Sequence, residues 1–551
     1  MTTPEGSRGF FQGEQEERNF LRNEFGLIRV DPIGERGLPY FAYLSEFDGW
    51  AVEKESFLGK WLDFSPVKRL KGVAQLGLNR NFPLPNTHTR FDHSAELTVR
   101  TVLSLRQLAR DHREEFLKMS SGYSLNLAPN LSGREKEEEQ ILKAIKLGAI
   151  YAASHDIATP AGGDGIKYVF GLDDDQDLPD VLSWNSAEFS RLCQEDGFDP
   201  ETIAPIFTKI AQRNDEGILG QLIHKSGGEN RGFDLDSICY TLMDAWRCLD
   251  FFQRDPFPDN KTARVAGEIG QASKGDIIQE QFQGLARGFE ERHRELNRQA
   301  RGYIGLYQRL LTDFCLNGLP CNLDNLDPRV SFGPTGRVLF FQDFVSFTQL
   351  VLKEEKVVFT DPYRMDRLWL LNNFLVDYLY FHPSLLGPEI GLMTYIRSQR
   401  GDPVSSGEKR YLLTVDDHRL LEDLKKNSPR VAYWFSNLAS LGWEGSNLAC
   451  KSPYVRYLSE SADTDEACVF TNILLEIKKM PTRLGTPVLA SGETRNLGEV
   501  FPNRGEDIEK RKRHMAFINN IFPAWSRPLS IRFTDEYIHS QRHRLEREPY
   551  W

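Results

Sequence analysis

The chain has 551 residues, with 40% hydrophobic and 27% charged side chains, ordinary values for a folded protein that exclude overall disorder. Its formal net charge of −11 argues against nucleic acid as the main partner, because proteins that bind phosphate backbones usually carry a basic excess. The seven cysteines form no Cys-x-x-Cys pair, and the sequence shows neither a membrane-length apolar run nor a signal peptide. We therefore expect a cytoplasmic protein that does not bind membranes.

The predicted elements begin with a polar, glycine-containing stretch over residues 1–25, which we expect to be a flexible arm. Short apolar and aromatic pieces between turn signals predict strands or irregular structure over 26–60. Apolar residues at helical spacing then predict helices over 92–118 and 135–155, the second opening on acidic residues that suit a helix N-terminus. Further helices are expected around 200–224, 234–253, 278–316 and 364–381.

The later part of the chain carries weaker patterns. We expect the acidic run DDDQD at 173–177 to be a solvated loop rather than a metal loop. Residues 401–551 contain no motif, and we expect them to form an assembly or regulatory region. The predicted fold class is mainly α, with small β elements near the N-terminus and a mixed C-terminal region.

The dipeptide His155-Asp156 ends a strongly apolar helix, where an imidazole or a carboxylate is costly unless it has a partner. Proline and glycines follow and allow the backbone to turn tightly. His93 and Asp236 each stand at the start of another predicted helix. Two imidazoles and two carboxylates suit Mn, Fe, Zn or Mg. In the plainer interpretation, His155 only caps a helix and His93 is an ordinary side chain.

Five sequence blocks follow one another between about residues 28 and 250. They are VDPI at 30–33, KRLK and QLG within 68–77, HTRFDHS at 88–94, HDI at 155–157, and DLD with Tyr240 and Asp244 within 234–244. In this order they resemble the HD-domain deoxynucleoside triphosphate triphosphohydrolases, a family of dNTPases and dGTPases, and especially its SAM-and-HD-domain type. The resemblance implies an HD-domain helical core over residues 26–400.

The resemblance also implies a reaction and a set of roles. A dNTP would be hydrolysed in one step, at its α-phosphorus, to deoxynucleoside and triphosphate. Arg90 would hold phosphate, as a planar guanidinium does well. Gln75 and Asp244 would bind the sugar 3′-hydroxyl, and Tyr240 would close the space of a ribose 2′-hydroxyl. The implied ligands of the divalent metal are His93, His155, Asp156 and Asp236.

The block over residues 234–244 also allows an interpretation other than sugar and metal binding. Asp236, Tyr240 and Asp244 are spaced so that they share one face of a helix, which could instead be a polar seam.

Three further residues, Asp63, Lys68 and Lys71, stand where the SAM-and-HD-type relatives bind an activating nucleotide between subunits. The resemblance therefore implies a homo-oligomer with a possible nucleotide effector. It also suggests a part in antiviral or antiphage defence by depletion of dNTPs. Exposed lysines more commonly belong to an ordinary solvated surface.

The chain departs from the family directly after Asp156. Thr159 and Asp164 occupy the places of two family histidines, one of which is the usual proton donor to the leaving oxygen, and a later His-Glu pair is missing around 184–188. We expect Asp164 to take over part of this work, by protonation, through a water or by holding a second metal. Lys167 would oppose the first of these by favouring the ionised form.

Two other functions remain open beside a dNTP triphosphohydrolase. One is an HD phosphohydrolase acting on another nucleotide, or a nuclease, although a nuclease would need a basic groove with stacking aromatics that the acidic composition does not indicate. The other is a catalytically weak nucleotide sensor or scaffold. The intact set of expected ligands argues against a sensor, whereas the two lost histidines argue for it.

Overall fold

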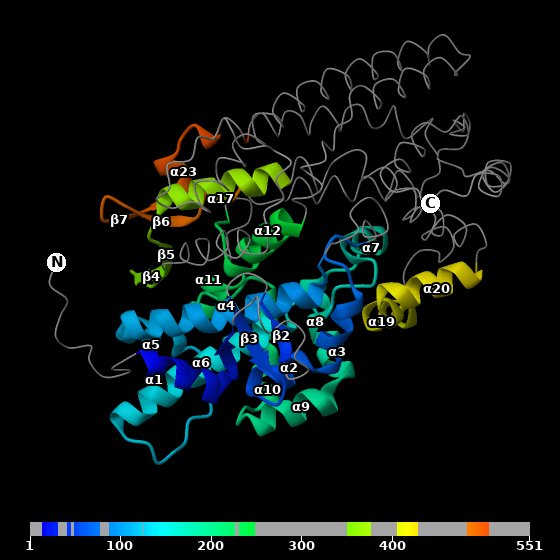
Figure 1. The fold of residues 1–551 in the computed structure, drawn as a ribbon, viewed down its shortest axis with the longest axis horizontal. Coiled ribbons are helices and arrows are strands. Elements are labelled where there is room, and N and C mark those ends of the chain that lie inside the picture. The colour runs from blue at the N-terminus through cyan, green and yellow to red at the C-terminus, as the bar shows by residue number, and fades with distance from the viewer. Residues whose placement is uncertain are drawn as a thin grey trace, which may run out of the picture.

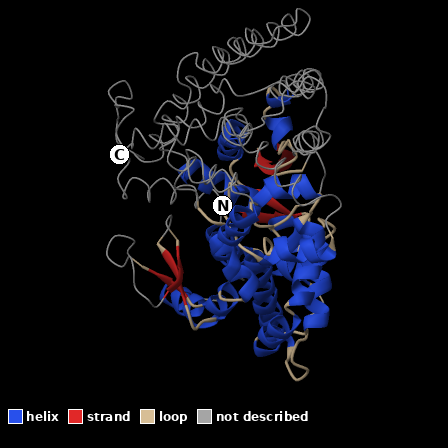
Figure 2. Ribbon diagram, turned by 90° about the vertical axis from the view of Figure 1, so that its right-hand side faces the viewer, coloured by secondary structure: helices blue, strands red, loops and turns tan. Residues whose placement is uncertain are grey.

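The computed structural model describes residues 14–30, 41–45, 49–77, 88–123, 125–225, 231–247, 350–375, 405–427, 482–505 and 508. Over these residues the protein is mostly helical and has two small sheets, which confirms the predicted fold class. Figure 1 shows the described helices as the main body, and Figure 2 shows the strands as separate groups beside it.

The N-terminal part packs onto the helical body. The expected flexible arm differs here, because Leu21 and Phe25 are buried and anchor residues 14–25, while residues 1–13 lie outside the described residues. The three strands form an antiparallel sheet in the order β1-β3-β2. The elements are α1 (Glu14–Phe20), a π-helical turn (Leu21–Phe25), β1 (Leu27–Arg29), β2 (Phe41–Leu44), β3 (Trp50–Glu53), α2 (Phe57–Leu62), α3 (Ser65–Arg69) and a 3-10 turn (Leu70–Gly72).

The helical body is built around two long helices, α4 and α6, which pack against each other. A Cβ added to Gly148 of α6 would lie 2.6 Å from Leu105 of α4 and 2.8 Å from Leu219 of α11, so only glycine permits this close approach. The helices of the body are α4 (Arg90–Asp111), α5 (Arg113–Ser120), α6 (Gly133–Ser154), α7 (Gly163–Phe170), α8 (Asp174–Trp184), α9 (Ser186–Glu195), α10 (Pro200–Ala211), α11 (Ile218–Leu222) and α12 (Leu235–Arg247).

Within the described residues, the predictions differ from these elements at three places. The helix expected over 92–118 is broken at His112, and the one over 200–224 is divided into α10 and α11, where Asp215 accepts hydrogen bonds from backbone N–H groups. The acidic run at 173–177 is not a loop, because Asp173 caps α8 and the following acids form its first turn. The helix expected over 278–316 lies outside the described residues.

The elements from residue 350 onward pack against the helical body formed by α4 to α12. α17 packs against α12, and the second sheet has the order β4-β5-β6-β7, with β5 and β6 parallel and the other pairs antiparallel. The expected division at residue 401 stays a prediction, although segments on both sides of it contact this body. The elements are β4 (Leu350–Lys353), β5 (Lys356–Phe359), α17 (Pro362–Leu375), α19 (Ser406–Thr414), α20 (Asp417–Asn427), β6 (Pro487–Ala490), β7 (Glu493–Asn496) and α23 (Leu497–Val500).

Asp417 ties together two segments that lie far from it in the sequence. One carboxylate oxygen accepts from the backbone N–H of Ala74 at 2.9 Å, and the other accepts from that of Gly162 at 2.7 Å. Arg69 adds hydrogen bonds to the carbonyls of Val415, Ile157 and Thr159. These contacts, called the Asp417 brace below, fix the loop after α6 against α3 and α20.

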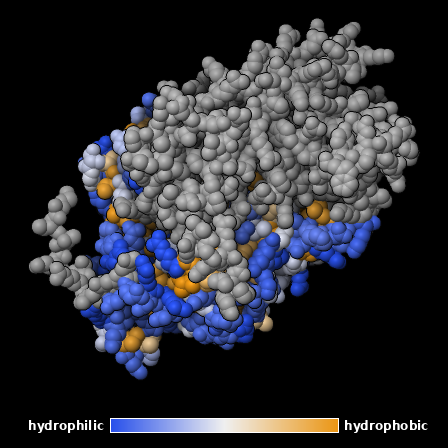
Figure 3. Space-filling view, viewed as in Figure 1, coloured by the Kyte–Doolittle hydropathy of each residue, from blue (hydrophilic) through white to orange (hydrophobic). Residues whose placement is uncertain are grey.

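The outer faces of the helices are polar, as expected for amphipathic helices around a core. Hydrophilic residues cover most of the described surface in the view of Figure 3, apart from an apolar patch near its middle. Among the helices within the described ranges, none has the length and apolar character needed to cross a membrane.

Candidate metal centre

Three helix ends converge on one buried point. His93 lies in the first turn of α4, which opens on a capping box made by Thr89 and Asp92. His155 ends α6 and Asp156 follows it, while Asp236 lies in the first turn of α12. Because each helix end is fixed by its own caps and packing, the side chains are held in place from separate directions.

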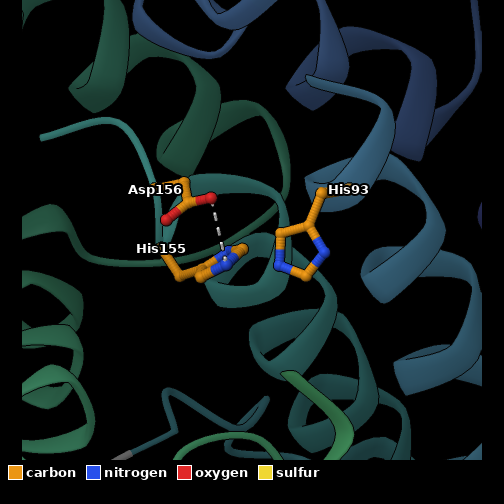
Figure 4. A group of neighbouring side chains, drawn as sticks. All are labelled: His93, His155 and Asp156. Atoms are coloured by element: carbon orange, nitrogen blue, oxygen red, sulfur yellow. Dashed lines mark ion pairs between the residues drawn. The ribbon is translucent and has the colours of Figure 1, made fainter. Parts of the chain in front are cut away.

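The structure brings all four expected ligands together. Nε2 of His93 lies 2.9 Å from Oδ1 of Asp236, and Nε2 of His155 lies 3.5 Å from the same oxygen and 3.6 Å from Oδ2 of Asp156. Figure 4 shows the rings of His93 and His155 side by side next to Asp156; their centroids are 5.2 Å apart and their planes are inclined by 68°. The ligand atoms of these three residues lie within 4.8 Å of one another.

The orientation of His155 suits metal binding. Its Nδ1 lies 2.8 Å from the carbonyl oxygen of Ala152, which can only accept, so Nδ1 carries a proton and Nε2 faces the cluster. Within the described part of the chain, this buried Nε2 makes no hydrogen bond. His155 thus does end a helix, as the plainer interpretation holds, but its second nitrogen is left for the centre.

Without a metal the cluster is a set of ion pairs. Burial lowers the pKa of His155, but Asp156 and Asp236 outweigh it and raise that pKa to about 9. Burial likewise raises the pKa of Asp156, and His155 and Arg90 outweigh it and lower that pKa to about 2. A divalent cation would replace the imidazolium proton as the partner of the carboxylates, so the donor set fits Mn, Fe, Zn or Mg.

His224 belongs to the same cluster and was missed by the sequence analysis. Its Nε2 lies 3.5 Å from Oδ2 of Asp236, and its ring centroid lies 5.5 Å from that of His155. Nδ1 lies 2.8 Å from the hydroxyl of Tyr151. No motif surrounds His224, and only its position behind the apolar segment of α11 could have indicated burial.

Comparisons with known proteins give no family for this chain. No family model and no curated protein matches the sequence. Solved structures that match this chain include a hypothetical protein from Aquifex aeolicus, at 15% identity and a TM-score of 0.43, covering 84% of this chain and 92% of that one. Another is a phosphohydrolase from Bacteroides thetaiotaomicron, at 12% identity and a TM-score of 0.36, covering 82% and 92%. These TM-scores are too low to support a function.

Arg90 and Asp164 form a charged chain beside the cluster. Nη1 of buried Arg90 lies 3.3 Å from Oδ2 of Asp156, and its Nη2 lies 2.9 Å from Oδ2 of Asp164. The other oxygen of Asp164 lies 2.7 Å from Lys167. Burial raises the pKa of Asp164, but Lys167 and Arg90 outweigh it and lower that pKa, so the carboxylate is favoured at neutral pH. Of the three roles expected for Asp164, this environment disfavours proton donation.

The glycines after Asp156 place Asp164 at this position. Gly162 and Gly163 both adopt left-handed backbone angles, with φ of 83° and 66°. A Cβ on Gly163 would lie 2.9 Å from Cα of Gly77, so the turn also needs the missing side chain. The tight turn expected from the sequence is therefore present, and it starts α7 with Asp164 in the first turn.

The residues expected to bind the sugar lie around α12. Oδ1 of buried Asp244 lies 3.7 Å from Nε2 of His88, whose carbonyl accepts from the backbone N–H of Gln75 at 3.0 Å. The hydroxyl of Tyr240 accepts from Arg483 at 3.1 Å. Arg483 comes from the segment before β6 and was not indicated by any motif. The substrate roles of Gln75, Tyr240 and Asp244 stay predictions.

The residues expected to bind an effector lie apart from the cluster. Nζ of Lys68 lies 2.8 Å from Oδ1 of Asp63, and both side chains are more than half exposed. Lys71 extends over the ring of Phe91, with its Nζ 4.3 Å from the ring centroid. An exposed ion pair of this kind is common on protein surfaces, so an effector site here stays a prediction.

Proposed function

We propose that the protein is a metal-dependent phosphohydrolase that cleaves dNTPs to deoxynucleoside and triphosphate. The observation that carries the proposal is the buried cluster of His93, His155, Asp156 and Asp236, in which Nε2 of His155 faces the carboxylate oxygens of both aspartates. These four residues would hold the metal. A bound divalent ion would polarise the phosphorus and lower the pKa of a bound water toward neutrality.

Arg90 supports a phosphorylated substrate rather than another electrophile. Its guanidinium is buried beside Asp156, where a bound phosphate would meet little competing water. In the proposed reaction Asp164 is a positioning residue, since it orients Arg90 and stays anionic beside Lys167. The proton for the leaving oxygen would then come from a water held near Asp164.

The preference for deoxyribonucleotides rests on Tyr240, proposed to fill the space of a 2′-hydroxyl. Its hydroxyl is held by Arg483, which is itself 3% exposed, so the ring has a fixed position. A ribose hydroxyl forced against it would lose both space and hydrogen bonds. We expect dNTP turnover to exceed NTP turnover by roughly a hundredfold, a typical discrimination against one added hydroxyl.

The first experiment is a product analysis. Purified protein is incubated with Mn²⁺ or Mg²⁺ and each dNTP, each NTP or a single-stranded DNA, and the products are separated by chromatography. Deoxynucleoside plus triphosphate supports the proposal. Pyrophosphate or strand cleavage would instead indicate another nucleotide hydrolase or a nuclease, and tight binding without turnover would indicate a sensor.

Two variants refine the sugar test. Tyr240→Ala should raise NTP turnover relative to dNTP turnover, whereas the control Tyr240→Phe keeps the ring and should keep most of the preference. Equal dNTP and NTP rates in the parent protein would show that Tyr240 has another role. Effector control, a homo-oligomer and a part in antiviral defence are proposals that depend on this activity.

A further inference from the structure

His224 forms a second group of possible ligands next to the first. Its Nε2, that of His155 and an oxygen of Asp236 all lie within 4.8 Å of one another. The first group, His93 with His155 and Asp156, shares only His155 with it. One imidazole nitrogen binds one ion, so if His155 serves the first position, His224 and Asp236 are left to hold a second.

The two oxygens of Asp236 face different histidines. Oδ1 lies 2.9 Å from His93 and 3.5 Å from His155, whereas Oδ2 lies 3.5 Å from His224. A carboxylate in this position can bridge two cations, as in two-metal hydrolases whose ions lie about 3.5–4 Å apart. Asp236 therefore divides the cluster into two sides.

His224 is oriented from behind in the same way as His155. The hydroxyl of Tyr151 lies 2.8 Å from Nδ1 of His224, and Tyr151 is fully buried. A hydroxyl can accept a hydrogen bond, so Nδ1 can donate to it and leave the Nε2 lone pair facing Oδ2 of Asp236. The backbone carbonyl of Ala152 orients His155 in the same way, because it accepts a hydrogen bond from Nδ1 of His155.

We propose that His224 and Asp236 hold a second divalent cation, with Asp236 bridging it to the ion at His93, His155 and Asp156. The proposal rests on the metal centre of the proposed function and adds an ion to it. With so few protein ligands, the second ion keeps positions for water and for a phosphate oxygen of the substrate, which suits Mg²⁺ or Mn²⁺. The inferred ligand is thus a nucleotide phosphate bound between two ions.

The test is the number of Mn²⁺ ions bound per chain, measured by calorimetry and by elemental analysis after dialysis. The wild-type protein should bind two ions, and His224→Ala should bind one. The control His418→Ala removes an exposed histidine of α20 and should leave two. A wild-type protein that binds one ion, or a His224→Ala variant that still binds two, would overturn the proposal.

Electron paramagnetic resonance gives a readout that is independent of activity. Two neighbouring Mn²⁺ ions broaden each other's spectrum, so the wild-type protein should show a coupled signal and His224→Ala that of an isolated ion. A second variant, Tyr151→Phe, tests the same ion without removing a ligand. It keeps the aromatic ring and should therefore fold even if His224→Ala is unstable. Loss of the Tyr151 hydroxyl should lower the affinity for the second ion by about tenfold to a hundredfold, as is typical when a partner of a metal ligand is removed. An unchanged affinity in Tyr151→Phe, or an isolated-ion spectrum in the fully loaded wild type, would count against the proposal.

The two proposals fail in different ways. Hydrolysis of dNTPs with one ion per chain leaves the proposed function standing and removes the second ion. Two coupled ions without dNTP hydrolysis leave the second ion standing and remove the proposed substrate.

Discussion

Possible ligand atoms lie within 4.8 Å of one another in two regions of the described ranges: the cluster around His155, which holds two overlapping sets of three, and the acidic run Asp173, Asp174 and Asp175. In the first, hydrogen bonds from outside fix Nδ1 of His155 and His224 and leave Nε2 facing carboxylates. Partners outside the cluster therefore orient its ligand atoms toward one another.

In the acidic run the oxygens already have partners. Asp173 accepts from the backbone N–H groups of Asp175 and Gln176 at the start of α8, and Asp174 lies 2.7 Å from Lys167. The helix N-terminus and a lysine thus compensate most of its negative charge. The comparison shows that proximity alone does not distinguish a metal site from a helix cap, whereas the partners behind each ligand atom do.

The largest effect should come from removing a ligand of the histidine cluster. His155→Ala should lose bound metal and reduce dNTP hydrolysis by roughly a hundredfold or more, since even partners of metal ligands typically cost 10–100-fold. Metal analysis and rate measurements check this, with His418→Ala as the control. Full metal content with normal activity in His155→Ala would mean that the histidine cluster, like the acidic run, is not a metal site.

A smaller effect is expected at the edge of the cluster. Asp164→Asn removes the charge that orients Arg90 and should lower kcat by about tenfold to a hundredfold with little change in KM. The control Asp180→Asn changes a comparably exposed carboxylate that pairs with Lys409. Equal rates in both variants would make Asp164 an ordinary carboxylate in the first turn of a helix.

The pH profile separates the roles of Asp164. Because its pKa is lowered, activity should not fall as pH rises through neutrality, as it would for a protonated acid. A fall in kcat above neutral pH that disappears in Asp164→Asn would restore the proton-donor role.

The pH dependence of metal binding tests the histidine cluster alone. The metal-free protein holds the pKa of His155 at about 9, and binding requires the neutral imidazole. Below that pH, protons compete with the metal, so Mn²⁺ affinity should fall by about tenfold for each unit of decreasing pH. Titrations at several pH values measure this slope. A flat profile would mean that His155 is not a ligand.

The smallest effect belongs to the acidic run. Asp173→Ala should lower the free energy of unfolding by about 1 kcal/mol, a typical cost of losing a helix cap, without changing metal content. Asp199→Ala removes a similar cap from α10 and should cost a similar amount. Loss of metal in Asp173→Ala, but not in Asp199→Ala, would show that the run is a site after all.

The sequence predicts best what depends on local periodicity. Helices α4 and α6, and the placing of His93 and His155 at their ends, follow from apolar spacing and capping residues. The ionised state of Asp164 could also be foreseen from nearby Lys167. Such features need only neighbours along the chain.

Features that depend on distant pairing could not be predicted. His224 joins the cluster through Tyr151, 73 residues away, and Arg483 reaches Tyr240 across 243 residues. The anchoring of residues 14–25 by Leu21 and Phe25 was missed because a polar composition hides the few apolar side chains in this segment. None of these contacts leaves a spacing signal in one sequence.

The Asp417 brace also has a consequence for folding order. Its hydrogen bonds join residues separated by 343 and 255 positions, and Arg69 reaches Val415 over 346. Contacts of such long range close large loops and form late in folding. A chain emerging from the ribosome can build α4 and α6 early, yet the loop behind His155 gains its final support only after residue 417 has been synthesised. Metal capture by the nascent protein should therefore be a late event, and fragments that end before α20 should bind metal weakly.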